Sequence, residues 1–309
     1  MSATSFSKSA FNASAMPQHL FGYNVVEFLG EGAGSRIYVV TEPATHKLFA
    51  LKHVVRKEEK DIRFVEQLEA EFEVSRHFRH PGLRRALDLK INKTLLRRVT
   101  EAALVMELVD GTPLDSRPPE RMADMVSVFI GTAHALAALH QLGYVHCDLK
   151  PNNILVDSSG SVKIIDFGQA CKSGTVKERI QGTPDYISPE QVRCEPVVQR
   201  TDIFNFGATM YWGLTGRKIP TLFTIKRAEN SFLVDSEIPS PRELNPRVPE
   251  PLSNLVMDCC RTVAAKRPGD IGEIAHRLEI MHHGLTRPIP AATFPAPTPT
   301  IPRQTSVLA

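Results

Sequence analysis

Two carboxylates, a lysine and an amide lie close together in the middle of the chain, at Asp148, Lys150, Asn153 and Asp166. Carboxylate and amide oxygens are hard donors of the kind that Mg²⁺ prefers, which suits Asp166 and Asn153. Asp148 can accept the proton of an incoming hydroxyl, and Lys150 can neutralise a phosphoryl group as it moves. Any one of these residues is common in a turn or a helix cap, but their combination and spacing predict phosphoryl transfer.

The surrounding sequence, H-x-D-x-x-x-x-N from His146 followed by D-F-G from Asp166, resembles the signature of the eukaryotic-type (Hanks-type) Ser/Thr protein kinases. The resemblance implies an α+β, bilobal protein-kinase fold, in which a small β-rich N-lobe carries helix C and the larger C-lobe is mainly helical. It implies ATP and Mg²⁺ as cofactors, with Mn²⁺ as the alternative ion. It also assigns Asp148, Lys150 and Asn153 to catalysis, and Asn153 and Asp166 to the metal.

A cluster of glycines lies near the N-terminus between two apolar, strand-like runs, 25–29 and 37–40. The backbone of such a hairpin can close over phosphates, although most glycine-rich turns bind nothing. The cluster departs from the family pattern G-x-G-x-x-G because Ser35 stands at the third glycine, and we expect this to change the flexibility of the loop. The loop residues predicted to contact the nucleotide are Gly30, Glu31, Gly32, Ala33, Gly34 and Ser35.

The sequence F-A-L-K that ends at Lys52 resembles the family strand V-A-I-K, which implies that Lys52 contacts the α- and β-phosphates. A lysine near the end of a strand is ordinary, so its expected partner decides the interpretation. Apolar residues at helical spacing predict a helix over 61–78. Glu71 stands at the family position for the helix-C glutamate that pairs with this lysine, with Glu69 and Glu73 as nearby alternatives.

A short apolar strand begins at Ala103 and runs out at the turn signal Asp110-Gly111, and it resembles the strand and hinge that join the two lobes. The resemblance implies that backbone groups of Glu107 and Val109 bond to adenine, with Met106 as the gatekeeper beside it. A plain core strand shows the same pattern, and the two roles are compatible. The apolar residues implied to sandwich the base are Ile37, Ala50 and Leu155.

The segment 182–190 resembles the family substrate loop G-T-x-x-Y-x-[AS]-P-E. Thr183 in that loop, together with Lys150, is the form typical of Ser/Thr rather than tyrosine kinases. Asp202 matches the acid that braces the backbone of the catalytic loop. Arg267 matches the arginine that pairs with Glu190, and we expect structural roles for both Asp202 and Arg267.

Two further departures from the family concern stability and regulation. Ser75 replaces the apolar residue that usually lies behind the phenylalanine of D-F-G, which predicts a less stable active arrangement. Cys147 stands where regulated kinases often have an arginine that grips a phosphate on the activation loop (169–181). Without the Arg-Asp pair the chain is of the non-RD type, which predicts that its activity depends little on phosphorylation of the activation loop. A redox-sensitive thiol at Cys147 is the alternative to a small residue packed in a loop.

Composition fits one bilobal catalytic domain, with 309 residues and 42% hydrophobic residues. The net charge of +3 is mild, and the pairs Arg84-Arg85 and Arg97-Arg98 are interpreted as solvated surface, so we expect neither a nucleic-acid nor a membrane partner. Five cysteines without metal-ligand spacing predict a reducing, cytoplasmic setting. No signal-peptide pattern and no uninterrupted apolar run of membrane length occur in the sequence. The oligomeric state stays open.

Shifts in composition predict the domain organisation. The N-terminal segment is rich in Ser, Ala and Asn, and the C-terminal tail in Pro and Thr, so both are predicted to be disordered. The tail is either a docking or autophosphorylation segment or an inert extension. The predicted boundaries are 1–18 for the N-terminal segment, 19–283 for the kinase domain (N-lobe 19–109, C-lobe 110–283) and 284–309 for the tail. Within the C-lobe we expect a helix over 122–142 that ends at Gly143, and closing helices over 251–261 and 271–283.

Three functions from different classes are compatible with these motifs. The first is a protein kinase that transfers the γ-phosphate of Mg·ATP to Ser/Thr hydroxyls of protein substrates, with autophosphorylation. The second is a pseudokinase that binds ATP as a scaffold, and the third is a small-molecule phosphotransferase. The first is favoured because every catalytic residue type is present and because the substrate loop is that of protein kinases.

Overall fold

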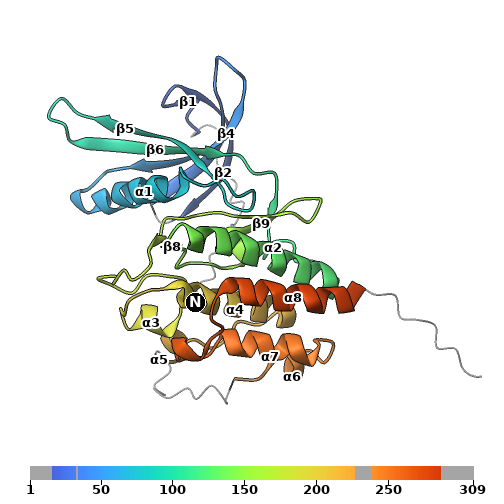
Figure 1. The fold of residues 1–309 in the computed structure, drawn as a ribbon. Helices are drawn as coiled ribbons and strands as arrows, with labels where there is room; N and C mark the ends of the chain where they lie inside the picture. The colour runs from blue at the N-terminus through green and yellow to red at the C-terminus, as the bar shows by residue number, and fades with distance from the viewer. Residues whose placement is uncertain (1–15, 33, 227–237, 287–309) are drawn as a thin grey trace, which may run out of the picture.

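The computed structural model describes residues 16–32, 34–226 and 238–286, which form a small lobe above a larger one (Figure 1). The small lobe holds a six-stranded sheet and one α-helix, and the large lobe is mainly helical. This arrangement confirms the predicted α+β, bilobal fold. The disorder predicted for 1–18 and 284–309 falls mostly on 1–15 and 287–309, which lie outside the described residues, as does Ala33 of the glycine-rich loop.

The strands of the small lobe pair antiparallel in the order β1-β2-β3-β4-β6-β5. Since β3 pairs with one edge of β4 and β6 with the other, Lys52 of β4 lies opposite both Ile37 and Leu104. Sequence analysis predicted the runs that form β2, β3, β4 and β6, but it did not predict β5. The elements of this lobe are β1 (His19–Leu20), β2 (Tyr23–Gly32), β3 (Ser35–Thr41), β4 (Leu48–Val55), α1 (Ile62–Ser75), β5 (Ala86–Lys93) and β6 (Val99–Glu107).

The large lobe contains the helices that the sequence predicted, with small differences at their ends. The helix predicted over 122–142 ends at Gln141, and Gly143 follows with a left-handed φ of 80°. The last helix continues to Thr286, past the predicted domain end at 283, because Leu285 still packs on the core. The helices are α2 (Met122–Gln141), α3 (Pro189–Val192), α4 (Gln199–Thr215), α5 (Leu222–Lys226), α6 (Pro241–Leu244), α7 (Glu250–Cys259) and α8 (Ile271–Thr286), and the strands are β7 (Thr112–Pro113), β8 (Tyr144–Val145), β9 (Ile154–Val156), β10 (Val162–Ile164) and β11 (Cys171–Lys172).

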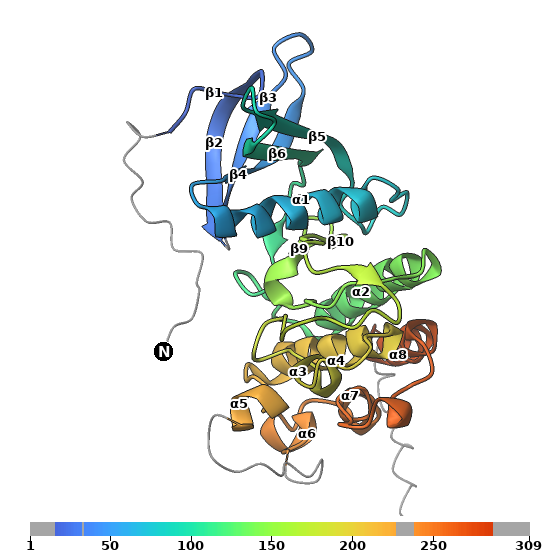
Figure 2. The ribbon, with the colours of Figure 1, turned by 90° about the vertical axis from the view of Figure 1, so that its left-hand side faces the viewer.

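Helix α1 connects the sheet to the large lobe. Its residues Val65 and Leu68 are buried in the cluster that the sheet also lines, and Figure 2 shows the helix between the sheet and the strands β9 and β10. The helix ends at Ser75 rather than at the predicted Phe78, whose N–H bonds to the Ser75 carbonyl in a turn. Because one face of α1 is turned toward the lobe junction, Glu71 is only 1% exposed.

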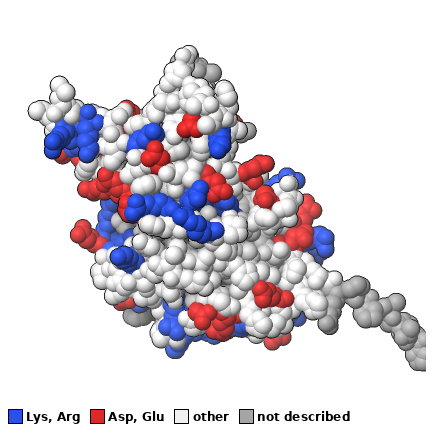
Figure 3. Space-filling model, turned by 45° about the horizontal axis from the view of Figure 1, so that its top comes forward, with Lys and Arg blue, Asp and Glu red and all other residues white. Residues whose placement is uncertain are grey.

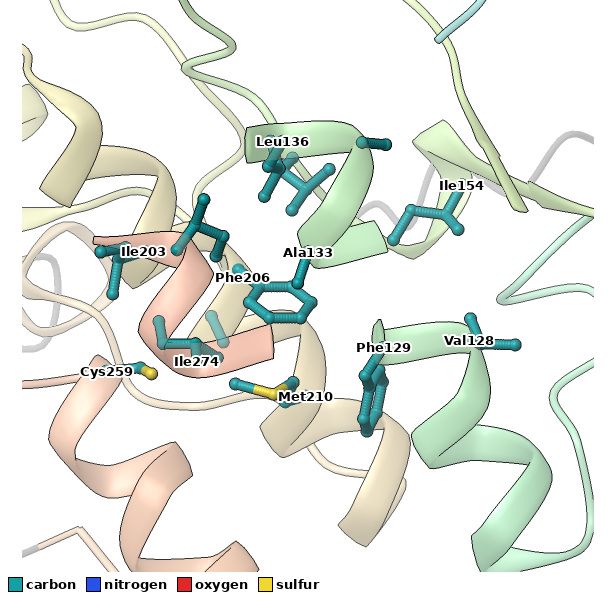
Figure 4. Close-up of a cluster of buried hydrophobic side chains, with 14 of the residues drawn as sticks. Val128, Phe129, Ala133, Leu136, Ile154, Ile203, Phe206, Met210, Cys259 and Ile274 are labelled. Atoms are coloured by element: carbon teal, nitrogen blue, oxygen red, sulfur yellow. The ribbon is translucent and has the colours of Figure 1, made fainter. Parts of the chain in front are cut away.

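The core of the large lobe lies where α2, α4, α7 and α8 meet (Figure 4). Phe129 of α2 and Phe206 of α4 stack edge to face, with ring centroids 6.2 Å apart. Met210 of α4 and Ile274 of α8 fill the space beside them. This packing fixes α2, whose C-terminal end leads directly into the catalytic loop.

Helix α2 is long and apolar enough, by length and composition only, to cross a membrane. The sequence has no uninterrupted apolar run of that length, because the helix also contains polar residues such as Asp124 and His134. In the structure 56% of its most apolar window is buried inside the large lobe. Packing against α4 and α8 therefore accounts for its composition.

Charged side chains of both signs are mixed on the surface. Figure 3 shows a band of Lys and Arg across the middle of one face, with acidic side chains around it. The interpretation of Arg84-Arg85 as solvated surface holds for Arg85 and is wrong for Arg84, which is 7% exposed. Arg84 is buried at the lobe junction, where its backbone N–H donates to the Ile164 carbonyl over 3.0 Å.

A buried ion pair anchors the end of the predicted substrate loop. The Arg267 guanidinium donates to both carboxylate oxygens of Glu190, over 2.7 and 2.9 Å, which confirms the predicted pair. Thr201 of α4 donates to the same carboxylate. Burial alone would raise the pKa of Glu190, but the hydrogen bonds and charge of Arg267 hold it below the usual value. Glu190 therefore stays ionised and connects α3 to α4.

The Glu190→Ala variant is expected to lose about 3–5 kcal/mol of unfolding free energy, because Arg267 would remain buried without its partner. Chemical denaturation measures this loss. Glu195→Ala removes an exposed glutamate only five positions away and is the matched control, with an expected change within about 0.5 kcal/mol. Equal losses in the two variants would contradict the anchoring role of the pair.

Candidate active site

Lys52, Glu71 and Asp166 meet at the junction of the lobes. The Lys52 ammonium donates to Glu71 over 2.7 Å and to Asp166 over 3.0 Å. The lysine comes from β4, the glutamate from α1 and the aspartate from the loop after β10. The predicted Lys52–Glu71 pair is thus confirmed, and the alternatives Glu69 and Glu73 are exposed on another face of α1.

The charges in this cluster stabilise one another. Burial alone would lower the pKa of Lys52, but the Asp166 and Glu71 carboxylates reverse that effect and hold it above its usual value. The Lys52 charge holds the pKa of Asp166 well below its usual range, against the opposing effect of burial. Lys150 and Arg84 add smaller contributions in the same direction. Lys52 and Asp166 are therefore both ionised at neutral pH, with their opposite charges in direct contact.

The D-F-G segment is held from two sides. Asp166 has a left-handed φ of 63°, a conformation that aspartate tolerates better than most residues. The Phe167 N–H donates to the second oxygen of Glu71 (3.2 Å), and the buried Phe167 ring packs against the rings of Phe78, at 4.6 Å, and His146, at 5.2 Å. Glu71 therefore positions both the lysine and the D-F-G backbone.

Ser75 shows how the chain accommodates a polar residue behind this segment. Its buried hydroxyl donates to the Glu71 carbonyl within α1, so the polar group is satisfied by the helix itself. The aromatic support for Phe167 comes instead from Phe78, which follows α1. Phe78 thus supplies part of the apolar contact that Ser75 cannot make, a role that the sequence did not predict.

The catalytic-loop residues form a compact polar group around Asp148. Lys150 donates to Asp148 over 2.9 Å and to the Thr183 hydroxyl over 2.8 Å. Thr183 in turn donates its hydroxyl and its N–H to the other oxygen of Asp148, over 2.7 and 2.8 Å. Asn153 donates its side-chain N–H to the Asp148 carbonyl, so its amide oxygen faces away from that bond. Thr183 was absent from the predicted catalytic residues, although its motif had been noted.

The backbone of the catalytic loop rests on one buried carboxylate. Asp202 is 0% exposed and accepts the N–H of His146 over 2.8 Å and that of Cys147 over 2.9 Å. His140 of α2 shares the Asp202 oxygen that accepts from His146 (2.8 Å). Cys147 has a left-handed φ of 64°, which this backbone anchoring supports. The predicted bracing by Asp202 is confirmed, whereas the contribution of His140 was not predicted.

The glycine-rich loop lies close to α1 at one point. A β-carbon on Gly34 would lie 2.7 Å from the Phe64 ring, and its φ is 79°, so glycine is required there on both grounds. The Ser35 hydroxyl donates to the Gly32 carbonyl over 2.9 Å and closes the turn. Gly30, Glu31 and Gly32 end β2, and Ser35 begins β3.

The residues implied to surround adenine come from both lobes. Ala50 lies opposite Met106 in neighbouring strands of the sheet, and both are buried. Ile37 belongs to the same sheet, whereas Leu155 belongs to β9 in the large lobe. The Glu107 side chain pairs with Lys163 of β10. The prediction that the backbone groups of Glu107 and of the half-buried Val109 bond to adenine does not involve this side chain.

Arg84 is the charged residue of this site that sequence reasoning missed. Its guanidinium lies 3.9 Å from Glu71, and burial lowers its pKa despite the nearby carboxylates. It adds positive charge behind the cluster of Lys52 and Asp166. No spacing signal in the sequence marks an arginine as buried.

Comparison with known proteins agrees with this geometry. The family model described as the protein kinase domain matches residues 23–283, and the chain therefore belongs to this family. The serine/threonine-protein kinase PrkC of Bacillus subtilis is 28% identical over 271 residues, which cover 83% of this chain and 39% of that protein. The serine/threonine-protein kinase PknB of Mycolicibacterium smegmatis is 30% identical over 211 residues, covering 65% of this chain and 33% of that protein.

A plant relative extends the similarity beyond bacteria. The serine/threonine-protein kinase TIO of Arabidopsis thaliana is 33% identical over 194 residues, or 61% of this chain and 14% of that protein. The chain spans only about a third to two-fifths of the length of these bacterial relatives. The similarity therefore concerns the kinase domain, and these names describe the relatives rather than this chain.

The contact between Lys52 and Glu71 is expected to show a coupling free energy of about 0.5–3 kcal/mol in a double-mutant cycle. The cycle compares the unfolding free energies of Lys52→Met, Glu71→Gln, the double variant and the unchanged protein. The surface pair Lys60–Glu58, whose side chains are 68% and 63% exposed, is the control, with an expected coupling of about 0–1 kcal/mol. A buried pair that couples no more strongly than this control would show that the two residues do not depend on each other.

Proposed function

We propose that the protein is an active serine/threonine kinase that transfers the γ-phosphoryl group of ATP to Ser and Thr hydroxyls of proteins, its own chain included. The observation that carries the proposal is the contact of Lys52 with both Glu71 and Asp166. A lysine held by a buried glutamate beside an ionised aspartate offers a cation for phosphates and an anion for a metal. Membership of the protein kinase family and the names of the relatives support the same activity.

The donor set fits a divalent cation such as Mg²⁺. Asp166 is ionised, its side chain is 41% exposed, and only one of its oxygens bonds to Lys52. Asn153 directs its amide nitrogen to the protein backbone, which leaves the amide oxygen for a cation. Two hard oxygen donors suit Mg²⁺ or Mn²⁺, which keep waters and phosphate oxygens as their other ligands. When bound, the ion would neutralise phosphate charge.

The remaining residues would act on the acceptor and on the moving phosphoryl group. Asp148 would orient the acceptor hydroxyl and take its proton, and Lys150 would lie beside the transferred group. Both now bind the Thr183 hydroxyl within 2.9 Å, so this pair already accommodates a hydroxyl group. Thr183 would thus position the base and the lysine relative to each other.

We further propose a cytoplasmic enzyme, with proteins rather than nucleic acid or membranes as partners. The five cysteines all lie in the part of the chain that the structure describes, and none of them is in a disulfide, as expected in a reducing compartment. On the face in Figure 3 acidic side chains surround the band of Lys and Arg, and the net charge is only +3, so charge does not favour nucleic acid as a partner.

Transfer of labelled γ-phosphate from Mg·ATP to casein tests the activity. Asp148→Asn is expected to reduce transfer by about 10²–10⁴-fold, because the base is lost while the side-chain volume is retained. Asp166→Asn is also expected to abolish transfer, because the carboxylate that would bind the magnesium ion is lost. Nucleotide binding without any transfer by the unchanged protein would instead favour the pseudokinase scaffold.

We also propose that activity needs no phosphate on the activation loop. Cys147 occupies the place of the phosphate-gripping arginine, and the loop is held by other contacts. Lys177 donates to the Gln169 carbonyl over 2.9 Å, and Gln191 donates to the Gln181 carbonyl over 3.1 Å. Strand β11 pairs with β8 at the beginning of the same loop.

The double variant Ser173→Ala/Thr175→Ala is therefore expected to keep the turnover of the unchanged enzyme. Both hydroxyls lie between β11 and the substrate loop, and the Thr175 hydroxyl donates to the Lys172 carbonyl (2.6 Å). Initial rates of peptide phosphorylation measure the effect. A collapse of turnover in the double variant, with folding unchanged by circular dichroism, would show that the loop depends on phosphorylation.

A further inference from the structure

Two cysteines far apart in the sequence lie next to each other beside the catalytic loop. Cys147 precedes the catalytic Asp148, and Cys171 begins β11, five positions after Asp166. Strand β11 pairs with β8 so that Cys171 lies opposite Val145, and the Sγ atoms of the two cysteines are 3.8 Å apart. A disulfide needs about 2.05 Å, so the sulfurs would have to approach by about 1.8 Å.

The two thiols have opposite electrostatic environments. Cys171 is half-buried and accepts a hydrogen bond from Cys147, which, together with the Lys177 charge and the hydroxyl of Thr175, lowers its pKa to about 6. Cys147 is buried, and its pKa is raised by the contact with Cys171, by burial and by the Asp202 charge. Cys171 is thus a thiolate at neutral pH, and Cys147 keeps its proton.

We propose that Cys171 and Cys147 form an oxidation site that closes to a disulfide when a hydroperoxide reaches the Cys171 sulfur. The Cys171 thiolate attacks one peroxide oxygen, the O–O bond breaks, and with one proton from solvent the products are the Cys171 sulfenic acid and water. Cys147 then attacks this sulfur, the S–O bond breaks, and the thiol proton leaves with the oxygen as a second water. In total, two thiols and one hydroperoxide give one disulfide and two waters when the oxidant is hydrogen peroxide.

The surrounding contacts decide which cysteine moves. The N–H of Cys147 bonds to Asp202, and its carbonyl accepts from Gln191 over 2.7 Å, so its backbone is held on both sides. Cys171 lies on a strand of only two residues, and the next residues along the loop, 172–174, are exposed. The approach of the sulfurs therefore draws β11 toward the catalytic loop. The bond would tie the beginning of the activation loop to the residue next to Asp148.

The test treats the full-length, reduced protein with a small excess of hydrogen peroxide and follows its mass and its non-reduced tryptic peptides. We expect a loss of about 2 Da, one cross-linked pair of peptides that contain Cys147 and Cys171, and full reversal by dithiothreitol. Cys171→Ser should abolish the bond, and the matched control Cys194→Ser should behave like the unchanged protein. A protein that forms no bond, a bond to another cysteine, or oxidation to sulfinic acid without a bond would overturn the proposal.

Two further measurements separate the steps. In Cys147→Ser the sulfenic acid at Cys171 should accumulate and be trapped by dimedone, because the resolving thiol is missing. In Lys177→Met the rate of Cys171 alkylation by iodoacetamide at neutral pH should fall several-fold relative to the unchanged protein, since a stabilising charge is lost. If Cys171 reacts no faster than the half-buried Cys194 in the unchanged protein, the assignment of the thiolate to Cys171 is wrong.

The structural effect of the bond can be measured without any assay of phosphoryl transfer. Arg179 is exposed on the activation loop, and trypsin should cut after it more slowly in the oxidised protein than in the reduced one. The difference should disappear in Cys171→Ser. Equal cleavage of the oxidised and reduced forms would show that the bond does not restrain the loop. Failure of the kinase proposal would leave these readouts unaffected.

Discussion

The geometry of the site depends on a buried glutamate that must be neutralised. Glu71 is 1% exposed, and such a carboxylate is strongly destabilising unless cations and hydrogen-bond donors surround it. Lys52, the Phe167 N–H and, at 3.9 Å, Arg84 meet this need. Because these partners come from separate elements, they reach Glu71 only when α1, the sheet and the D-F-G segment are correctly placed. A buried ion pair adds little net stability over apolar packing, so its contribution here is chiefly to position.

The large lobe solves a similar problem with a different kind of donor. Asp202 is fully buried and is satisfied by two backbone N–H groups and the imidazole of His140. Because these two donors belong to the backbone and not to a side chain that could rotate away, the Asp202 carboxylate holds the main chain of the catalytic loop in place. The Glu190–Arg267 pair does the same for the end of the substrate loop. Asp148 therefore lies where the catalytic loop meets the substrate loop, each of which is held by a buried carboxylate.

Local spacing predicted the residues of the site better than it predicted their contacts. Glu71 could be chosen from sequence because family spacing singles it out, but only the helix register shows that Glu69 and Glu73 point to solvent. The burial of Arg84 depends on a contact with Ile164, and the packing of Phe78 on Phe167 joins positions 89 residues apart. Such pairings arise from tertiary folding and leave no periodic signal in the sequence. The fold class was predictable because local motifs such as H-x-D-x-x-x-x-N and D-F-G carry the resemblance to the kinase family, and that resemblance implies the fold.

The departure at Cys147 has a physical consequence for the activation loop. An arginine at this position would need an anion, whereas Cys147 packs with the apolar Val145 and Val197. The beginning of the loop is accordingly held by a short strand pair, by sulfur contact and by apolar burial, interactions that salt screens much less than an exposed ion pair. The exchange removes the cation that would bind a phosphate on the loop, which supports our proposal that activity needs no such phosphate. It also places a soft, polarisable sulfur beside the catalytic aspartate, where a second sulfur is already within contact distance.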